Sequence, residues 1–475
     1  MRLNRMTLAV NFLLAGLFGM LVVSCGKGSL NDMIIISQAP VNAPPSDLIA
    51  GKSWRYVAGA RIIAVDPEKP SSVQVLTPEF YAACAPVVSF DGRLMYFSAK
   101  QQSGDPWQIW EMDLASRKSR KVTSVSDCID PVCLPAGQLV FSKLTKNDTV
   151  KTTYALYACK TDGSQLRQIT FSPQADLASS VLKDGRLLTI THRLFPENEG
   201  QVMNALRPDG TKADIFYKGE AGSKLAGRAQ ETPDGRIVFI EAVPGENSPG
   251  NVISISYNRP LHSRRNLTAG LGGDFNAVFP LKSGRLMVSC RKPGLDHFAL
   301  FEFDPSAKTL GKVLFDQSGY NVLEALMAEE RDIPKKLPSE VDFGVKTGLL
   351  LCQDINVLSD LASLTGASFP KASKVEILGI DSSMGIVRVE KDGSFYLKIM
   401  ANTPFRLRTL DNNNKVLNGP CEWIWLRPNE RRGCVGCHED QELVPENKVP
   451  LAVKSLPVAV PVHVSGINEK EVELE

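Results

Sequence analysis

The chain has little net charge of either sign. Its 54 Lys and Arg residues against 52 Asp and Glu residues leave a formal net charge of +2. Without a global positive field, nucleic acid is not an expected partner. Aromatic residues make up only 7% of the 475 residues, and a single stretch is apolar enough to enter a bilayer, which excludes a polytopic membrane protein. The 36 Gly and 30 Pro residues favour a turn-rich, mainly β protein of two or three domains.

The single apolar stretch lies at the N-terminus. Arg2 and Arg5 precede an apolar run over residues 8–23, which is the layout of a signal peptide. The run ends in LVVSC, which resembles the lipobox of bacterial lipoproteins, so we expect residues 1–24 to be a lipoprotein signal peptide and Cys25 to carry the lipid. Residues 25–51 are then a lipidated linker. The alternatives are an uncleaved anchor helix and ordinary secretory cleavage.

These features predict an exported protein whose lipid anchor holds it on a membrane, facing the periplasm. By resemblance to lipoprotein sorting rules, Gly26 and Lys27 after the cysteine favour the outer membrane over the inner. An oxidising compartment permits disulfides and also houses the attachment of c-type haem.

Ten cysteines are present, and three of them are assigned to lipid and to the motif described below. Seven remain: Cys84, Cys128, Cys133, Cys159, Cys290, Cys352 and Cys421. Only Cys352 and Cys421 of these lie in the C-terminal part, so they form the predicted disulfide. The alternative is a pair of buried thiols.

A repeat with a period near 48 residues dominates the middle of the chain. A polar-Gly turn followed by an apolar run recurs as DGRLMYFS, AGQLVFSK, DGRLLTIT, DGRIVFIE and SGRLMVSC, with glycines at positions 92, 137, 185, 235 and 284. A second hairpin follows each unit. Four strands per unit at this period are typical of a β-propeller blade.

Five full units do not close a ring by themselves. An outer hairpin from Ile62 lies before the first unit and a lone apolar stretch from Asn321 lies after the fifth. Joining them completes a sixth blade and leaves only short strand edges. We therefore predict a six-bladed β-propeller over residues 52–333, with another β architecture as the alternative. The repeat resembles the Tol-associated propellers of the bacterial periplasm, a resemblance that implies a scaffold and no particular activity.

A second domain follows a linker at residues 334–343. Alternating apolar residues around the Asp392-Gly393 turn, with Phe395, Leu397 and Ile399 after it, read as strands. Residues 344–433 are therefore predicted to form a small β-sandwich-like domain. Residues 434–475 form a haem attachment segment and tail.

The motif CVGCH stands at residues 434–438. C-x-x-C-H is the attachment sequence for c-type haem, in which Cys434 and Cys437 hold the vinyl groups and His438 ligates the iron. One covalent haem c is therefore the expected cofactor. Half of a zinc site or a redox dithiol is the competing interpretation, but no second C-x-x-C and no βαβ unit accompany the motif.

The sixth iron position has two candidate side chains. His463 is the sole histidine after the motif and would give bis-histidine ligation, whereas Met400 would give His/Met ligation. An open position, with His463 a tail residue, is the alternative. In the propeller, His192, His262 and His297 are single histidines that carry no catalytic pattern; Asp296 beside His297 could orient that imidazole, although strand neighbours face opposite sides.

The stretch from VRVEKDGSFYLKI through CVGCHED resembles the middle domain of the hydrazine synthase alpha subunit, and the order of propeller and haem domain is also similar. The resemblance implies that Cys434 and Cys437 hold the haem. It also implies a Tyr ligand four residues after the motif histidine, where Glu442 stands here. The second haem domain of that subunit has no counterpart, since no other C-x-x-C-H occurs.

Three functions remain. The first hypothesis is electron transfer by one haem c, with the propeller as docking platform for a redox protein partner. The second is a haem enzyme that converts a small nitrogen or oxygen compound, similar to hydrazine synthase. The third is a non-haem interaction scaffold.

Overall fold

The computed structural model describes residue 30 and residues 32–44, 46–49, 51–53, 55–145, 153–196, 200–220, 222–242, 250–357, 370–436, 442 and 447–461. Within these ranges every regular element is a β-strand except one 3-10 turn, η1 (Leu451–Lys454). The described part of the chain holds no helix long and apolar enough to cross a membrane. The protein is thus nearly all β, as its turn-rich composition predicts.

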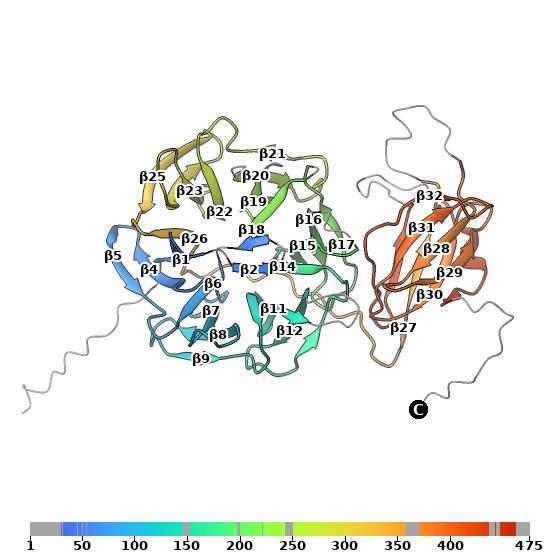
Figure 1. Ribbon diagram of the computed structural model, residues 1–475, viewed down its shortest axis with the longest axis horizontal. Coiled ribbons are helices and arrows are strands. Elements are labelled where there is room, and N and C mark those ends of the chain that lie inside the picture. Colours follow the sequence, from blue (N-terminus) through green and yellow to red (C-terminus); the bar gives the residue numbers. More distant parts are fainter. Residues whose placement is uncertain are drawn as a thin grey trace, which may run out of the picture.

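The N-terminal part forms a propeller-like ring of four-stranded antiparallel sheets (Figure 1). Six such sheets occur there among the described residues, and five of them follow the chain order. The innermost strands β6, β10, β14, β18 and β22 contact one another in turn, and β26 contacts both β22 and β6. The first three sheets consist of β6 (Ala82–Val88), β7 (Leu94–Lys100), β8 (Gln108–Asp113), β9 (Ser119–Lys121); β10 (Cys128–Leu134), β11 (Gln138–Thr145), β12 (Thr153–Lys160), β13 (Arg167–Gln168); and β14 (Ala175–Val181), β15 (Leu187–Arg193), β16 (Gly200–Leu206), β17 (Asp214–Tyr217).

The next two sheets repeat this arrangement. They consist of β18 (Lys224–Glu231), β19 (Arg236–Ala242), β20 (Gly250–Ser256), β21 (Arg265–Asn266); and β22 (Asp274–Pro280), β23 (Leu286–Arg291), β24 (Ala299–Asp304), β25 (Thr309–Phe315). In each sheet the repeated polar-Gly turn joins the first two strands. Gly92, Gly137, Gly185, Gly235 and Gly284 all have positive φ, between 67° and 90°. Glycine tolerates this conformation without strain, which explains the repeated motif.

The closing sheet takes strands from both ends of the ring. Its order is β26 (Tyr320–Met327), β1 (Ile34–Pro40), β4 (Arg61–Asp66) and β5 (Lys69–Val75). The hairpin from Ile62 and the stretch from Asn321 therefore share a sheet, as the sequence predicts. However, β1 lies between them, in the stretch that the sequence analysis assigned to a lipidated linker. Its residues are buried because they pair with β26 on one side and β4 on the other.

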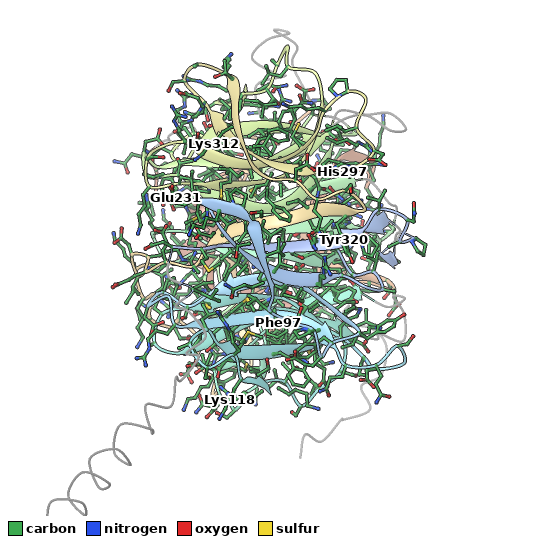
Figure 2. All side chains as sticks on the ribbon, turned by 90° about the vertical axis from the view of Figure 1, so that its left-hand side faces the viewer. Phe97, Lys118, Glu231, His297, Lys312 and Tyr320 are labelled. Atoms are coloured by element: carbon green, nitrogen blue, oxygen red, sulfur yellow. The ribbon has the colours of Figure 1, made fainter. Side chains whose placement is uncertain are left out.

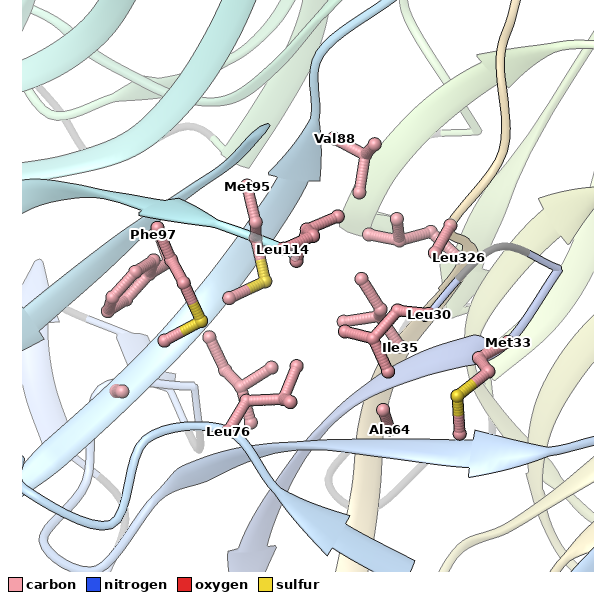
Figure 3. Packing of buried hydrophobic residues seen from close by; sticks show 14 of the residues in the cluster. Leu30, Met33, Ile35, Ala64, Leu76, Val88, Met95, Phe97, Leu114 and Leu326 are labelled. Carbon is pink, nitrogen blue, oxygen red and sulfur yellow. The ribbon is translucent and has the colours of Figure 1, made fainter. Parts of the chain in front are cut away.

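An apolar core fills the space between neighbouring sheets. Figure 3 shows one cluster in which Ile35 and Leu326, from the closing sheet, pack near Met95 and Phe97 of β7. Leu326 lies more than 200 residues after Met95 and Phe97 in the sequence. The short hairpin of β2 (Ser46–Ile49) and β3 (Gly51–Ser53) is drawn at the centre of the ring in Figure 1.

The C-terminal domain is a pair of four-stranded sheets. One has the order β33 (Arg431–Cys434), β27 (Thr347–Cys352), β30 (Phe395–Met400), β34 (Val458–Val460), and the other β29 (Ser383–Arg388), β28 (Lys374–Leu378), β31 (Arg406–Leu410), β32 (Val416–Asn418). One apolar cluster joins the two sheets, with Leu397 and Ile399 from the first and Val375 and Ile377 from the second. This agrees with the predicted sandwich-like domain. Both edge strands of the first sheet pair in parallel and come from the segment around and after the CVGCH motif.

In the structure the linker is the segment between β26 and β27, residues 328–346, which is longer than the predicted 334–343, and it lies along the ring. The backbone N–H groups of Arg331 and Lys335 donate to the carbonyl oxygens of Phe90 and Lys183, at 2.8 and 3.0 Å. Further along, the N–H of Glu340 donates to the Asp209 carboxylate at 2.7 Å. The linker is therefore fixed to the ring at successive points and sets the position of the C-terminal domain.

Candidate functional site

A cavity of about 260 Å³ lies between the ring and the C-terminal domain. Its wall on the ring side comes mainly from the β14–β17 sheet, and its opposite wall comes from the sandwich. Three cysteines from the second domain line it, namely Cys352, Cys421 and Cys434. Much of the remaining lining is buried and apolar: Ile355, Val375, Phe395, Leu407, Trp423 and Trp425.

Cys434 reaches this cavity because β33 adds to the edge of the sandwich sheet. Its strand pairs in parallel with β27, and the register places Cys434 beside Cys352. The N–H groups of Gln353 and Asp354 donate to the carbonyls of Cys434 and Val435, at 2.9 and 3.1 Å. The first cysteine of the predicted haem motif is therefore held by a backbone ladder.

The glycine inside the motif is required by packing. A Cβ atom on Gly436 would lie 2.3 Å from the carbonyl oxygen of Val357, which is closer than real Cβ contacts. Any larger residue would push the motif away from the chain beyond β27. Glycine at position 436 thus lets the chain pass close to Val357.

A buried carboxylate docks this segment on the ring. Glu430, 1% exposed, accepts hydrogen bonds from the backbone N–H of Lys212 at 2.8 Å and from Arg432 at 2.7 Å. The guanidinium of Arg432 also donates to the carbonyl of Ala213 at 3.2 Å. A buried charge is stable only when it is paired and hydrogen-bonded. Here the Arg432 guanidinium provides the opposite charge and the Lys212 N–H provides a further hydrogen bond. Because Arg432 stands two residues before Cys434, the same contacts position the cysteine.

The two tryptophans ahead of the motif belong to the same interface. Trp423 Nε1 donates to the carbonyl of Phe195 at 3.0 Å, and Trp425 Nε1 donates to that of Gly210 at 3.2 Å. The guanidinium of Arg427 donates to the carbonyl of Asp209 at 3.0 Å. Each indole thus buries an apolar ring in the cavity wall while its N–H is satisfied across the interface.

One polar relay leads away from the cavity into the ring. Asn204 and Thr191 line the cavity; the Asn204 amide donates to Thr191 Oγ1 at 2.8 Å, and that hydroxyl donates to Asp176 Oδ1 at 2.6 Å. Asp176 is 2% exposed, and its Oδ2 has no hydrogen-bond partner among the described residues. Burial raises the pKa of this carboxyl to about 6. The sequence showed no sign of this group, because it stands in an ordinary strand.

Several of the predicted site residues lie outside the described residues. These are Cys25, Cys437, His438 and His463. Their roles remain predictions. Of the predicted disulfide pair, Cys421 Sγ accepts a hydrogen bond from the N–H of Leu407 and donates to the carbonyl of Glu422, both at 3.2 Å. The pairing of Cys352 with Cys421 also remains a prediction, although both side chains line one cavity.

The other candidate ligands do not line the cavity. Met400 is 48% exposed at the end of β30. His192 neighbours Thr191 on β15 but is not part of the cavity wall; burial lowers its pKa to about 4, so the imidazole is neutral at pH 7. Glu442 is directed to the ring instead, where it accepts hydrogen bonds from the N–H of Leu261 at 2.6 Å and from Arg259 at 3.3 Å.

His297 lies elsewhere, at the start of β24 (Figure 2). Its Nδ1 contacts Asp296 Oδ1 at 2.8 Å and its Nε2 contacts Asp316 Oδ1 at 2.7 Å. Asp296 therefore orients the imidazole, as the sequence allowed; the alternation of strand neighbours does not apply, because the two residues form a bend before the strand. Among the described residues, no group of three His, Cys, Asp or Glu side chains is arranged to hold a metal ion.

Comparisons with known proteins bear on this site directly. A family model for the hydrazine synthase alpha subunit middle domain matches residues 353–439. Hydrazine synthase subunit alpha from Kuenenia stuttgartiensis is 21% identical over 510 residues, which cover 80% of this chain and 62% of the relative. The chain thus spans less than two thirds of that relative's length.

A solved structure extends the likeness to the fold. The Kuenenia stuttgartiensis hydrazine synthase matches with a TM-score of 0.75 at 19% identity, covering 89% of this chain and 71% of that one. TolB from Acinetobacter baumannii matches with a TM-score of 0.44 at 11% identity, covering 68% of this chain and 73% of that one. The cavity, the cysteine at its wall and the docking residues lie in or beside the matched middle domain. The chain is thus similar to the hydrazine synthase alpha subunit, in sequence over the middle domain and in fold over most of its length.

Proposed function

We propose that this chain is a haem enzyme acting on a small nitrogen compound, with one haem c attached through Cys434 and Cys437 beside the cavity between the two domains. The observation that carries the proposal is the position of Cys434 at the wall of that cavity, within the matched middle domain. The comparisons favour this reading over electron transfer, which the sequence alone put first.

The residues present suit a covalent haem. Buried apolar and aromatic side chains, among them Phe395, Trp423 and Trp425, offer the surroundings that a porphyrin ring needs. Lys218 is exposed at the cavity wall and provides a positive charge for a propionate. His438 follows Cys437 directly and is proposed as the protein ligand of the iron. The haem supplies redox chemistry when bound.

The relay of Asn204, Thr191 and Asp176 is proposed to hold and move a proton at the cavity wall. A carboxyl with a pKa of about 6 exchanges its proton near neutral pH, which is the property that a general acid requires. The Thr191 hydroxyl lines the cavity and donates to Asp176 Oδ1; when the carboxyl is protonated it would donate to Thr191 instead and free the hydroxyl proton for the cavity, while the Asn204 amide holds Thr191 in place. Reduction of nitrogen compounds consumes protons, and this group provides one.

The electron-carrier alternative requires an iron with both axial positions filled by side chains. Met400 and His192 do not line the cavity, which leaves His463 as the side chain that would fill the second position. An enzyme requires that position open. The two functions therefore differ in whether the second axial position of the iron is filled by a side chain or open, which can be measured.

The ring and the N-terminus complete the proposal. We take the six four-stranded sheets as the blades of a closed six-bladed propeller, which shapes one wall of the reaction space. The predicted signal peptide and the lipid on Cys25 would place the protein on a membrane facing the periplasm. A redox protein partner would supply the electrons.

The test is an absorption spectrum of the purified protein from a host with haem-maturation machinery. We expect a high-spin spectrum that shifts when carbon monoxide is added to the reduced protein or cyanide to the oxidised protein. A low-spin spectrum that ignores both probes and becomes high-spin in His463→Ala would establish the electron carrier instead. Absence of a Soret band would overturn both and leave the non-haem scaffold.

A further inference from the structure

The centre of the ring holds four charged side chains in mutual contact. Arg55 Nη2 lies 3.1 Å from Asp130 Oδ1 and 2.5 Å from Glu324 Oε1. Arg228 lies 3.6 Å from each of the same two oxygens. The two carboxylates come from β10 and β26, and Arg228 from β18, so the cluster joins alternate inner strands of the ring.

A fifth charged group approaches from the linker. The backbone N–H of Arg331 donates to the carbonyl of Phe90, and its guanidinium donates to that of Val88. Within the described residues no carboxylate lies within 4.0 Å of this guanidinium. Glu329, the carboxylate whose charge acts on Arg331, is already paired with Lys282 at 2.8 Å. Burial and the neighbouring Arg228 both lower the pKa of Arg331.

The charges at the centre of the ring therefore do not balance. Three guanidinium groups, on Arg55, Arg228 and Arg331, face two carboxylates, on Asp130 and Glu324. Uncompensated charge in a poorly solvated site is strongly unfavourable, and the neighbouring guanidinium groups of Arg228 and Arg331 favour a bound anion between them.

The protein's own weak acids do not supply this anion. Burial raises the pKa of the Tyr56 phenol and the Cys84 thiol well above their ordinary values, and it raises that of the Cys133 thiol to about 12. All three side chains are neutral at pH 7. A small anion bound from solution would supply the missing negative charge.

A small cavity lies where this charge is needed. Its volume is about 50 Å³, and Arg228, Arg331 and Glu324 all line it. The Nε atoms of both arginines are buried without a hydrogen-bond partner, and so is Glu324 Oε2. The Arg228 side chain is only 8% exposed. The volume suits one small ion, with a water on the side of Glu324 Oε2, whose carboxylate would repel an anion.

We propose that this cavity binds one small monovalent anion of chloride or nitrite size between Arg228 and Arg331. The anion completes the charge balance at the centre of the ring. It also ties the linker to the inner strands, because Arg331 belongs to the linker and Arg228 to β18. This site is separate from the cavity between the domains and does not depend on haem.

The first test measures thermal unfolding of the full chain at constant ionic strength, with chloride or nitrite replacing gluconate. Chloride and nitrite are expected to raise the midpoint saturably by a few degrees, and the larger gluconate and the divalent sulfate are not. The ion that reaches half-saturation at the lower concentration is the anion that the site prefers. Equal midpoints in all four salts would overturn the proposal.

Arg331→Gln removes one side of the site while leaving the central four charges intact. This variant is expected to lose the saturable part of the shift, whereas Arg331→Lys keeps a positive charge and part of the shift. Arg285→Gln is the matched control, since Arg285 forms an ion pair on the surface with Glu302 at 3.0 Å; its anion response is expected to equal that of the wild type. A full response in Arg331→Gln would contradict the site.

Crystals grown in bromide provide a measurement that does not depend on stability. An anomalous peak is expected between Arg228 and Arg331. Bromide peaks confined to the surface would contradict the proposal, even if the salts altered the unfolding midpoint.

Discussion

Cys352 and Cys434 are register partners on the neighbouring parallel strands β27 and β33. Both belong to the apolar cluster of the C-terminal domain and both line the cavity between the domains. Adjacent strands lie about 4.8 Å apart, which is within the Cα separation that a disulfide spans. The thiol proposed to bind haem therefore has another thiol as its nearest neighbour across the sheet.

This neighbourhood predicts the oxidation product of the haem-free protein. Mild oxidation with a disulfide reagent is expected to link Cys352 to Cys434, because the strand ladder already aligns them. Peptide mapping after alkylation of the remaining thiols measures the pairing. Cys421→Ala should leave the product unchanged and Cys352→Ala should remove it. A peptide joining Cys352 to Cys421 would support the pairing expected from the sequence and contradict this one.

Arg427 is expected to hold the two domains together. Its buried guanidinium donates to the carbonyl of Asp209, in the propeller-like ring of sheets. The same group lies 4.7 Å from the centroid of the Phe171 phenyl group. Arg427→Met should cost about 3 kcal/mol of interface stability, since it leaves polar partners without a donor. Differential scanning calorimetry is expected to show the C-terminal domain unfolding earlier than in the wild type.

Arg431→Gln serves as the control for this change, because Arg431 is exposed on β33 only four residues away. Its unfolding profile should match that of the wild type. Identical profiles for Arg427→Met and the wild type would show that the interface does not depend on this side chain.

The carboxyl of Asp176 gives stability a defined pH dependence. Its pKa is raised from 3.8 to about 6 in the folded protein by burial. Between these values the folded state keeps a proton that the unfolded state releases, so stability falls as the pH rises through this window. Asp176→Asn removes this loss and should stabilise the protein by about 3 kcal/mol at pH 7, with the gain vanishing below pH 4.

Urea unfolding of Asp176→Asn and wild type at pH 4, 5, 6 and 7 measures this difference. Asp332→Asn is the matched control, since Asp332 is exposed on the linker. A gain independent of pH would indicate a packing effect, and a loss at pH 7 would contradict the raised pKa. The same variant is expected to lower turnover if the carboxyl supplies a proton, a separate outcome that stability alone does not produce.

His297 gives the stability of the protein a pH dependence in a higher window, above pH 6.5. Hydrogen bonds to Asp296 and then Asp316 raise its pKa above the ordinary 6.5. The protonated imidazole thus stabilises the folded state fully below pH 6.5, and this contribution is lost as the pH rises through the folded pKa. Because both carboxylates are exposed, His297→Gln should cost below about 1 kcal/mol at pH 6 and nothing at pH 9. An equal cost at both pH values would contradict this account.

The ring was largely predictable because its strongest signal is local. Positive φ at Gly92 and its four counterparts is a requirement of one short turn, so it is visible within eight residues. Alternating burial of Phe395, Leu397 and Ile399 is equally local. Strand β1 was not predictable in this way, because its burial comes from pairing with β26, almost 300 residues later.

For the site, the sequence predicted the haem-binding residues but not the cavity around them. The spacing of Cys434, Cys437 and His438 carries the haem signal by itself. In contrast, the wall contributed by Thr191 and Asn204 and the docking of Glu430 on the ring depend on how two domains meet. The charged cluster around Arg228 was invisible for the same reason, since its members come from four separated segments.

The most direct test of the account is the mass of the tryptic peptide that contains Cys434 and Cys437, prepared from protein made in a host with haem-maturation machinery. The account predicts this peptide with the added mass of one haem, and no haem on the peptides that contain Cys352 and Cys421. An unmodified peptide, from cells that load haem on another c-type protein, would contradict the proposed haem site and with it the enzyme.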